Sequence, residues 1–322
     1  MKEYKVEEIR IRIVSRFKEG GLSDLHANEM ANQLLYAELR NITSHGLVRV
    51  KWVLEQIHKY QNQKLIQLIA NDNIELYDGK DMLGYFALNE IVENQTFSNG
   101  KTIKFIGARN TYPTGALSYF AEKLAAKGWI VIMSSTSPRR VGLYGDKNPL
   151  VGTNPWTFSL PVPTQYGGHV IVDTSLAQLT HGQCLNMLMK RQDLPEYTVS
   201  LPGGLKVKEA EDLWNDGKWK AIIHPVGGQN SYKSFSIMWS LHLLGSGFLG
   251  LNEEQYGTFF ILMSPEIWEP VIPRNEIFKA FMREVELLRN SEVAHVPGEG
   301  KMQHFHENKD KIIISEELEK II

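Results

Sequence analysis

A histidine in a short polar turn is the residue that its sequence surroundings best suit to chemistry. The segment reads Ser44-His45-Gly46-Leu47-Val48-Arg49, between two helix-like runs. Because Arg49 comes four residues after His45, about one helical turn, both side chains can point at the same small acid. Imidazole can exchange a proton near neutral pH, and guanidinium can hold a carboxylate. Spacing alone is explained at least as well by a helix cap with a surface histidine and a salt-bridging arginine.

The neighbours of this histidine also have expected roles. Ser44 is expected to cap the helix that carries Arg49. Gly46 has no Cβ, so the backbone there can come close to a ligand.

Other motifs of the chain carry little chemistry. The run Gly245-Ser246-Gly247-Phe248-Leu249-Gly250 has GxGxxG spacing, but a dinucleotide-binding fingerprint needs a strand before it and an acidic residue about 20 positions later. The preceding run reads as a helix reaching its end. His304 and His306 stand in a charged stretch and are expected to be solvated, so no metal site is predicted.

Composition bounds the class of protein. The chain has 322 residues, 43% hydrophobic and 22% charged, which is typical of a folded globular protein. A net charge of -2 gives no basis for a nucleic-acid or anionic-membrane partner. The one cysteine, Cys184, excludes an internal disulfide and fits a reducing compartment, so a cytoplasmic location is expected. The apolar stretch from Ser234 to Gly250 predicts a buried helix rather than a membrane span.

Hydrophobic periodicity predicts an α/β (α+β) fold. Helices are expected over 6–17, 23–39 (capped by Ser23) and 47–60, and the first eight residues are expected to be helical. Further expected helices are 82–92, 116–127 and 275–289, and expected strands are 103–106, 129–133, 157–160, 170–172 and 258–263. The two chain ends, 1–64 and 265–322, would form a helical domain, and 65–264 an α/β domain that binds cofactor and substrate.

Several segments together resemble the malate/L-lactate dehydrogenase family. Thr43 to Arg49 resembles its SHGxxR motif and Leu150 to Pro155 its LxGTNP loop. Val172-Asp173-Thr174-Ser175 resembles its cofactor segment, and Pro297-Gly298-Glu299 its PGE element. The matches follow the family's order along nearly the whole chain.

The resemblance implies an oxidoreductase that binds NAD or NADP in a non-Rossmann manner, as a homodimer. It implies that His45 is the proton donor and that Arg49 binds the substrate. The residues it implies for cofactor binding are Ser137, Asp173, Thr174, Ser175, Lys233, Gly298 and Glu299. Further substrate contacts are expected from Ser44, Arg139, Arg140 and Asn154.

Three departures from the family pattern bear on the substrate. Pro113, within Asn110 to Gly115, stands where the family commonly has an acid/base histidine, and proline cannot transfer a proton. Lys233-Ser234-Phe235-Ser236 replaces a glycine-rich KGxG stretch. Arg139 and Arg140 follow Ser137, where neutral residues are usual. They could bind an added carboxylate or a cofactor phosphate, or simply be solvated.

Three functions remain open. The first is hydride transfer between a nicotinamide cofactor and C2 of a small 2-oxo or 2-hydroxy acid. The second is reduction of a cyclic ketimine such as a piperideine- or pyrroline-2-carboxylate, for which a second histidine matters less. The third is a catalytically degenerate relative that only binds a nucleotide.

Overall fold

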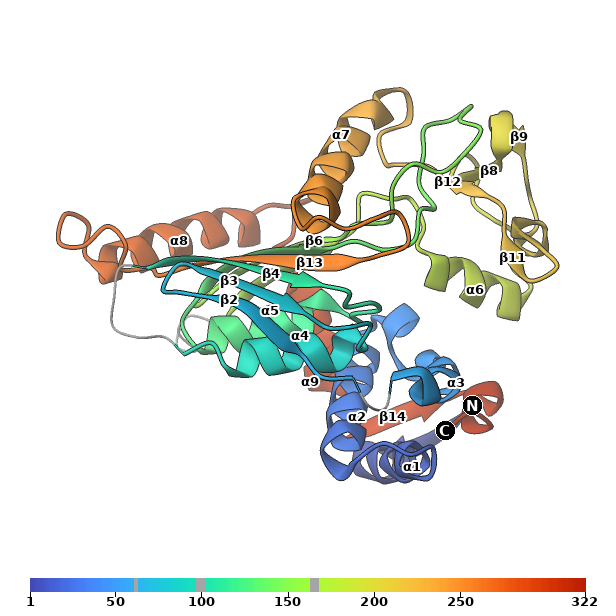
Figure 1. Cartoon of the computed structure of the whole chain (residues 1–322), viewed down its shortest axis with the longest axis horizontal. Coiled ribbons are helices and arrows are strands. Elements are labelled where there is room, and N and C mark those ends of the chain that lie inside the picture. Colours follow the sequence, from blue (N-terminus) through green and yellow to red (C-terminus); the bar gives the residue numbers. More distant parts are fainter. Residues whose placement is uncertain (61–62, 97–101, 163–167) are drawn as a thin grey trace. The chain divides into compact units, whose positions relative to one another are not determined.

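The computed structural model describes residues 1–60, 63–96, 102–162 and 168–322, and Figure 1 labels its elements. The chain forms two compact units. The first comprises Met1–Met133, Thr157–Asp173 and Phe260–Ile322, and the second comprises Ser134–Trp156 and Thr174–Phe259.

The first unit is mixed α/β. Its helices are α1 (Val6–Glu19), α2 (Asp24–Leu39), α3 (Val50–Tyr60), α4 (Gly84–Glu93), α5 (Leu117–Ala126), α8 (Arg274–Arg289), α9 (Glu299–Asn308) and α10 (Glu316–Glu319). Its strands are β1 (Lys2–Lys5), β2 (Ile66–Ala70), β3 (Ile74–Asp78), β4 (Ile103–Arg109), β5 (Ile130–Ser135), β6 (Trp156–Leu160), β7 (Val170–Thr174), β13 (Gly257–Met263) and β14 (Lys311–Ile314). Strands β5, β6, β7 and β13 continue by a few residues into the second unit.

A seven-stranded mixed sheet organises this unit, in the order β2-β3-β4-β13-β5-β6-β7. Strand β3 pairs antiparallel with β2 and parallel with β4. Helices α4 and α5 cover one face of the sheet (Figure 1). Phe120 and Leu124 of α5 pack there with Ile106, Val131 and Phe260 of the strands. Burial of this apolar layer is what holds helices and sheet together.

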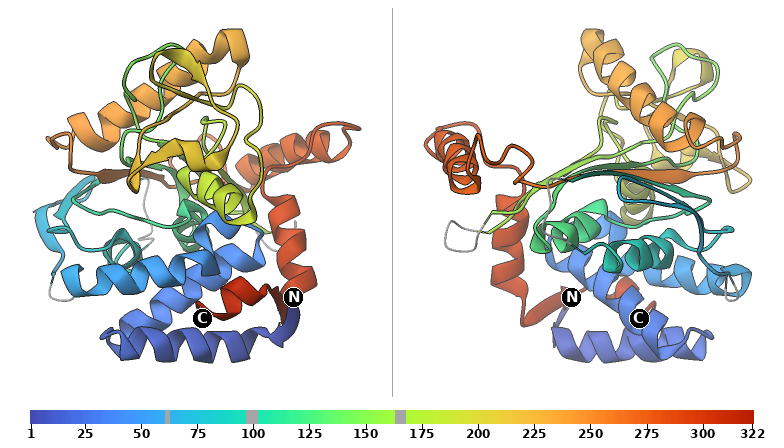
Figure 2. Two further views of the ribbon diagram at one scale, coloured as in Figure 1. Left: turned by 90° about the vertical axis from the view of Figure 1, so that its right-hand side faces the viewer. Right: turned by 60° about the vertical axis from the view of Figure 1, so that its left-hand side comes forward.

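Both chain ends belong to this unit and lie side by side (Figures 1 and 2). Strand β1 pairs antiparallel with β14, with Lys2 opposite Ile314. The prediction of a helical first segment was therefore wrong for Lys2–Lys5. Ile312 and Ile314 are buried with the core of α1 and α2, and a strand at the N-terminus is what satisfies the backbone of β14.

The predicted boundaries at 64/65 and 264/265 do not coincide with the two units. The terminal helices share one hydrophobic core with α4, in which Leu34 of α2 packs with Phe86 of α4 and Ile314 of β14. Because that core is continuous with the start of α4, the termini group with the sheet. The predicted cap of α2 is confirmed, since the Ser23 hydroxyl accepts a hydrogen bond from the His26 N–H at 3.2 Å.

The second unit contains small elements and two longer helices. These are α6 (His181–Lys190), α7 (Ser231–His242), β8 (Val199–Leu201), β9 (Leu205–Lys206), β10 (Trp214–Asn215), β11 (Lys218–Trp219) and β12 (Ile222–Ile223). A π-helical turn, Leu243–Gly247, continues α7, so the GxGxxG run follows a helix, as predicted. The predicted burial of the apolar stretch holds for part of it only: Met238 and Leu241 are buried, whereas Trp239 is 50% and Phe248 69% exposed within this chain. In the described part of the chain, no helix is both long and apolar enough to span a membrane.

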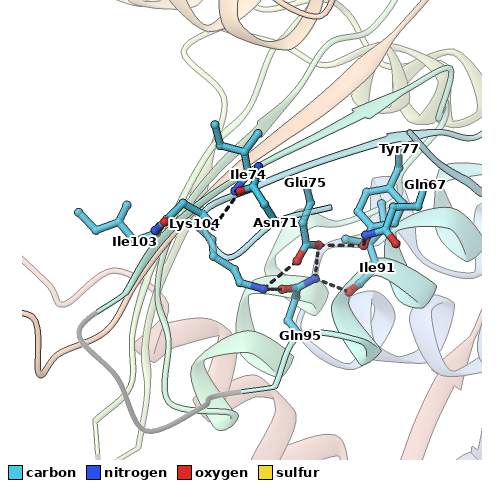
Figure 3. A network of polar contacts seen from close by, with 10 residues as sticks. Gln67, Asn71, Ile74, Glu75, Tyr77, Ile91, Gln95, Ile103 and Lys104 are labelled. Atoms are coloured by element: carbon cyan, nitrogen blue, oxygen red, sulfur yellow. Dashed lines mark hydrogen bonds and ion pairs between the residues drawn. The ribbon is translucent and has the colours of Figure 1, made fainter. Parts of the chain in front are cut away.

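A buried polar network stabilises the outer strands of the sheet (Figure 3). The Glu75 carboxylate, 9% exposed, accepts hydrogen bonds from Lys104 Nζ at 2.7 Å and from Tyr77 and Gln95 at 2.8 Å. These donors lower the pKa of Glu75 although burial opposes them. The carboxylate therefore stays charged inside the edge of the sheet because three neighbours satisfy it.

We predict that Lys104→Met lowers the free energy of unfolding by about 2–3 kcal/mol, because it leaves a buried carboxylate without its counter-charge. The matched control is Lys311→Met, which removes an exposed ion pair with Glu3 and should change the free energy of unfolding much less, because water screens that pair. Urea unfolding of both variants measures the difference. Equal decreases in the free energy of unfolding would show that the Glu75 network stabilises the fold no more than a surface ion pair does.

Candidate active site

Two short 3-10 turns, Thr43–His45 and Leu47–Arg49, place His45 and Arg49 between α2 and α3. The Ser44 hydroxyl is hydrogen-bonded to His45 Nδ1 at 2.9 Å, and Arg49 Nε donates to the Ser44 carbonyl at 2.7 Å. The expected helix cap by Ser44 is therefore wrong, since this hydroxyl holds the imidazole instead. Among the described residues, Nε2 of His45 has no hydrogen-bond partner, so it is the ring nitrogen left for a ligand.

A carboxylate from α2 replaces the expected cap. Glu38 Oε2 accepts a hydrogen bond from the Leu47 N–H at 2.8 Å. A Cβ added at Gly46 would stand 2.0 Å from the same oxygen, which is far inside contact distance. Burial raises the pKa of Glu38, and the bond from Leu47 opposes this rise. The space beside Gly46 is therefore occupied by the Glu38 carboxylate, which explains the glycine there. The sequence interpretation had assigned this space to a ligand.

Asp173, at the end of β7, is held by two elements of the first unit. Its Oδ2 accepts from the Ser118 N–H at 2.9 Å, at the start of α5, and its Oδ1 accepts from Thr157 Oγ1 at 3.1 Å. A carboxylate at a helix N-terminus is favoured by the free N–H groups and the helix dipole. Lys301 Nζ of α9 donates to the Asp173 carbonyl at 3.1 Å.

His45, Arg49, Asp173 and Lys301 form one electrostatic cluster within the first unit. Burial and the Arg49 charge lower the pKa of His45 to about 4; Asp173 opposes the shift and Lys301 adds to it. The sequence predicted titration near neutral pH, so this expectation needs correction. The ring is therefore harder to protonate than an ordinary histidine, chiefly because it is buried and next because of the Arg49 charge. Lys301 was not among the predicted site residues.

Gly298 and Glu299 begin α9 against β7. Gly298 has φ 92°, and a Cβ there would stand 2.4 Å from the Ile171 carbonyl oxygen. Only glycine combines this backbone conformation with so close an approach. The Glu299 carboxylate accepts from Arg289 Nε at 2.8 Å and from its Nη2 at 2.7 Å. Both residues thus fix the place of α9, and with it the place of Lys301.

A cavity of about 510 Å³ opens beside this junction, wholly within the first unit. Gly298, Glu299, Lys301, Ser118 and Ile171 line it. Its other charged or polar lining residues include Arg40, Glu122, His169, Arg289 and His306. Ser118 is 2% exposed, and its Oγ lacks a hydrogen-bond partner, as does Nδ1 of His169. Buried polar atoms without partners are uncommon in folded proteins, so they indicate a missing ligand or water.

The second unit brings Ser137 and Ser175 together around the Leu150–Pro155 loop. Ser137 Oγ accepts from the Thr153 N–H at 3.2 Å, and Ser175 Oγ donates to the Thr153 carbonyl at 2.7 Å. Thr174 is exposed next to Ser175. Asn154 is 1% exposed, donates to the Met238 carbonyl at 3.1 Å, and leaves its Oδ1 without a partner. The loop is thus fixed by the residues predicted to bind ligands.

The basic residues of the second unit that were predicted to bind ligands take no part in the hydrogen bonds of Ser137 and Ser175 given above. Arg139 is exposed and donates to the Leu150 carbonyl. Arg140 lies with Cζ 5.7 Å from the Trp219 ring centroid, and its Nε has no partner. Lys233 is exposed on α7 near the Tyr232 ring.

Tyr85 connects the segment of Pro113 electrostatically to Arg49. Tyr85 of α4 is buried, which raises its pKa to about 12, and it interacts electrostatically with Arg49 and Tyr112. Pro113 directly follows Tyr112, so this part of the site offers phenols where the family commonly offers an imidazole. Tyr85 was not predicted, because only tertiary packing brings α4 to Arg49.

The two histidines near the C-terminus do not form a metal site. His304 Nδ1 is hydrogen-bonded to the Leu39 carbonyl at 2.9 Å, so the expectation that it is solvated was wrong. His306 is exposed. Within the described ranges, no group of three or more histidine, cysteine, aspartate or glutamate side chains is arranged to hold a metal.

We predict that Gly46→Ala lowers the free energy of unfolding by at least about 2 kcal/mol, because the methyl group displaces the Glu38 carboxylate. Gly300→Ala is the matched control: a Cβ there meets nothing within 4 Å, and alanine favours helix α9 by about 0.5–1 kcal/mol. Urea unfolding of the two variants should give opposite signs. An unchanged free energy of unfolding in Gly46→Ala would contradict the packing of Glu38 against Gly46.

The depressed pKa of His45 makes stability depend on pH. The folded chain binds this proton less tightly than the unfolded chain, whose histidine titrates near pH 6.5. The contribution of the neutral His45 ring to the free energy of unfolding is therefore complete above about pH 6.5 and is lost as pH falls toward 4. When the pH falls from 7.5 to 5.0, the free energy of unfolding of wild type should decrease by about 2 kcal/mol more than that of His45→Gln. Denaturant titrations at both pH values measure this, with exposed His306→Gln as the control, and equal losses would contradict it.

Comparison with known proteins assigns the chain to a family. The sequence profile for malate/L-lactate dehydrogenase matches residues 4–321. The malate/(S)-sulfolactate dehydrogenase of Methanothermus fervidus is 26% identical over 236 residues, which are 70% of this chain and 66% of that protein, just under two thirds of its length. The ureidoglycolate dehydrogenase (NAD(+)) of Escherichia coli is 28% identical over 252 residues, 76% of this chain and 68% of that protein.

A solved structure shares the fold. The malate dehydrogenase from Entamoeba histolytica superposes with a TM-score of 0.85 at 19% sequence identity, over 99% of this chain and 97% of that one. The profile match over nearly the whole length, together with this fold, leads to one conclusion: the chain belongs to the malate/L-lactate dehydrogenase family.

Proposed function

We propose that the chain is an NAD(P)-dependent oxidoreductase that transfers hydride to or from C2 of a small 2-oxo or 2-hydroxy acid. The observation that carries the proposal is the cluster of His45, Arg49 and Asp173, which come from segments more than 100 residues apart. A titratable imidazole with one unengaged nitrogen, next to a guanidinium, can move a proton at an acid that the guanidinium holds.

The residues around the 510 Å³ cavity fit a nicotinamide cofactor bound in a non-Rossmann manner. The orphaned Ser118 hydroxyl and His169 nitrogen can bond to ribose or phosphate oxygens, and Arg40, Arg289 and Lys301 can offset phosphate charge. When bound, the cofactor supplies or accepts the hydride. Gly298 and Glu299 line this cavity, consistent with their proposed role. In the second unit we propose Ser137, Thr174, Ser175 and Lys233 as cofactor contacts.

His45 has a different role in each direction of the reaction. As a neutral ring it can accept the hydroxyl proton of a 2-hydroxy acid through Nε2. For reduction it must be protonated, and a substrate carboxylate on Arg49 would cancel the charge that disfavours the imidazolium. The anionic substrate thereby raises the proton affinity of the group that has to donate to it. Ser44, Arg139, Arg140 and Asn154 remain proposed substrate contacts.

A cyclic ketimine is the second candidate substrate, and Pro113 favours it. A protonated imine carries its own proton, so the site needs one proton donor fewer than for a ketone. The homodimer is also part of the proposal, because the exposed apolar side chains of α7, such as Trp239, suit a subunit interface.

The test compares wild type with His45→Ala on pyruvate-type acids, malate-type acids and cyclic imines, with NADH and NADPH. Loss of a proton-transfer group should lower kcat by about 10²–10⁴-fold while cofactor binding, followed by fluorescence, survives. Lys311→Ala, at an exposed position outside the cavity lining, is the control, and sedimentation equilibrium of the same preparations checks the homodimer. Unchanged turnover in His45→Ala would reject its role, and cofactor binding without turnover on any substrate would favour a degenerate binding protein.

A further inference from the structure

Helix α7 and the π-helical turn that continues it border a cavity of about 700 Å³, formed by residues of the second unit alone. The lining residues from this segment recur at helical spacing and so form one stripe: Phe235, Trp239, His242, Leu243 and Ser246. Leu150 and Leu251 line the cavity beside this stripe. These seven residues are called the α7 face below. Among the described residues, this cavity shares no lining residue with the one beside Gly298.

The large apolar side chains of the α7 face are open to solvent in the single chain. Trp239 is 50%, Leu243 42% and Leu150 41% exposed. Phe248, directly after the turn, is 69% exposed. Apolar side chains gathered around one hollow mark a contact surface in a soluble protein, and tryptophan is favoured at the centre of such contacts. The patch combines a hollow with exposed rings, which is what a self-complementary contact between two copies needs.

Two opposite charges line the same cavity. Arg139 and Glu253 are both exposed lining residues. In the part of the chain that the structure describes, Arg139 donates to the Leu150 carbonyl, and neither side chain takes part in a salt bridge. A two-fold axis can bring Arg139 of one copy to Glu253 of the other, and the pair then forms twice. Opposite charges placed in this way fix the register of an interface.

We propose that the α7 face is the contact between two copies of this chain, packed on each other around a two-fold axis, with Arg139 of each copy paired with Glu253 of the other. The inference rests on the homodimer of the proposed function and names the surface that forms it. It does not require hydride transfer. The centre of the α7 face is uncharged apart from a histidine, as the core of an interface usually is.

The first test reverses the two charges one at a time. Arg139→Glu and Glu253→Arg each place like charges opposite one another twice, so each should weaken dimerisation by about tenfold or more. An equimolar mixture of the two variants can form mixed dimers with two opposite-charge pairs and should dimerise about as tightly as wild type. Because mixing cannot restore a contact inside one chain, this result separates pairing between copies from pairing within a copy.

The second test changes the apolar centre. Trp239→Glu should weaken dimerisation by about 100-fold or more. Ile237→Glu is the matched control: Ile237 is 51% exposed on the same helix, does not line the cavity, and lies about 200° around the helix from Trp239. Lys208→Glu is the control for charge reversal, because the ion pair of Lys208 with Asp193 is exposed and lies outside the lining. Both controls should leave dimerisation unchanged.

Sedimentation of the fluorescently labelled chain, from nanomolar to micromolar concentration, gives the dissociation constant of each dimer. Low urea is added to all samples if wild type stays dimeric at the lowest concentration, and circular dichroism shows which variants are folded.

A dissociation constant unchanged in folded Trp239→Glu, or a mixture that dimerises no better than its two components, would overturn the inference alone. Loss of substrate affinity in Arg139→Glu with dimerisation unchanged would assign Arg139 to the substrate and also overturn it. A wild type that stays monomeric would overturn both the inference and the homodimer. Failure of hydride transfer would appear instead as activity retained in His45→Ala, so the failures are distinguishable.

Discussion

The carboxylate and carbonyl of Asp173 connect the elements on which the site depends. The carboxylate satisfies the N-terminus of α5 and the Thr157 hydroxyl of β6, and the carbonyl accepts from Lys301 of α9. These three hydrogen bonds tie the end of β7 to α5, β6 and α9. Burial and the Arg49 charge lower the pKa of His45, and the Asp173 carboxylate opposes this shift. Changing any member of this set therefore alters the environment of the imidazole.

Local sequence predicted the residues of the candidate site, but not the groups that hold them in place. The turn of His45 and Arg49 could be predicted, because a histidine between serine and glycine, with arginine four residues on, is informative without tertiary structure. The role of Ser44 could not, since a hydroxyl at a helix start usually caps it, and here Glu38 does so. Lys301 was missed because its place depends on how α9 docks on β7, and no spacing within the sequence encodes that docking.

The fold shows the same division. Helices α1, α2 and α5 and strands β4, β5, β6, β7 and β13 of the central sheet follow from sequence patterns, whereas β2 and β3 were not predicted. Strands β1 and β14 do not follow from such patterns, because each is short and pairs with a partner about 300 residues away. The predicted burial of α7 holds only for part of the helix, because apolar composition indicates that a helix needs cover but not whether the same chain supplies all of it. Pro113 could be noted as a departure from the sequence alone, whereas the electrostatic link of Tyr85 to Arg49 and Tyr112 depends on tertiary structure.

The central claim is that the His45 cluster and the cavity beside Gly298 form one site for substrate and nicotinamide. A crystal structure of the chain with NADH or NADPH and oxalate tests it most directly. The account predicts the nicotinamide ring within reach of the His45 imidazole, oxalate on Arg49, and cofactor density in the cavity lined by Ser118, Gly298 and Lys301. A cofactor bound away from this cavity, or a nicotinamide ring out of reach of His45, would contradict the account.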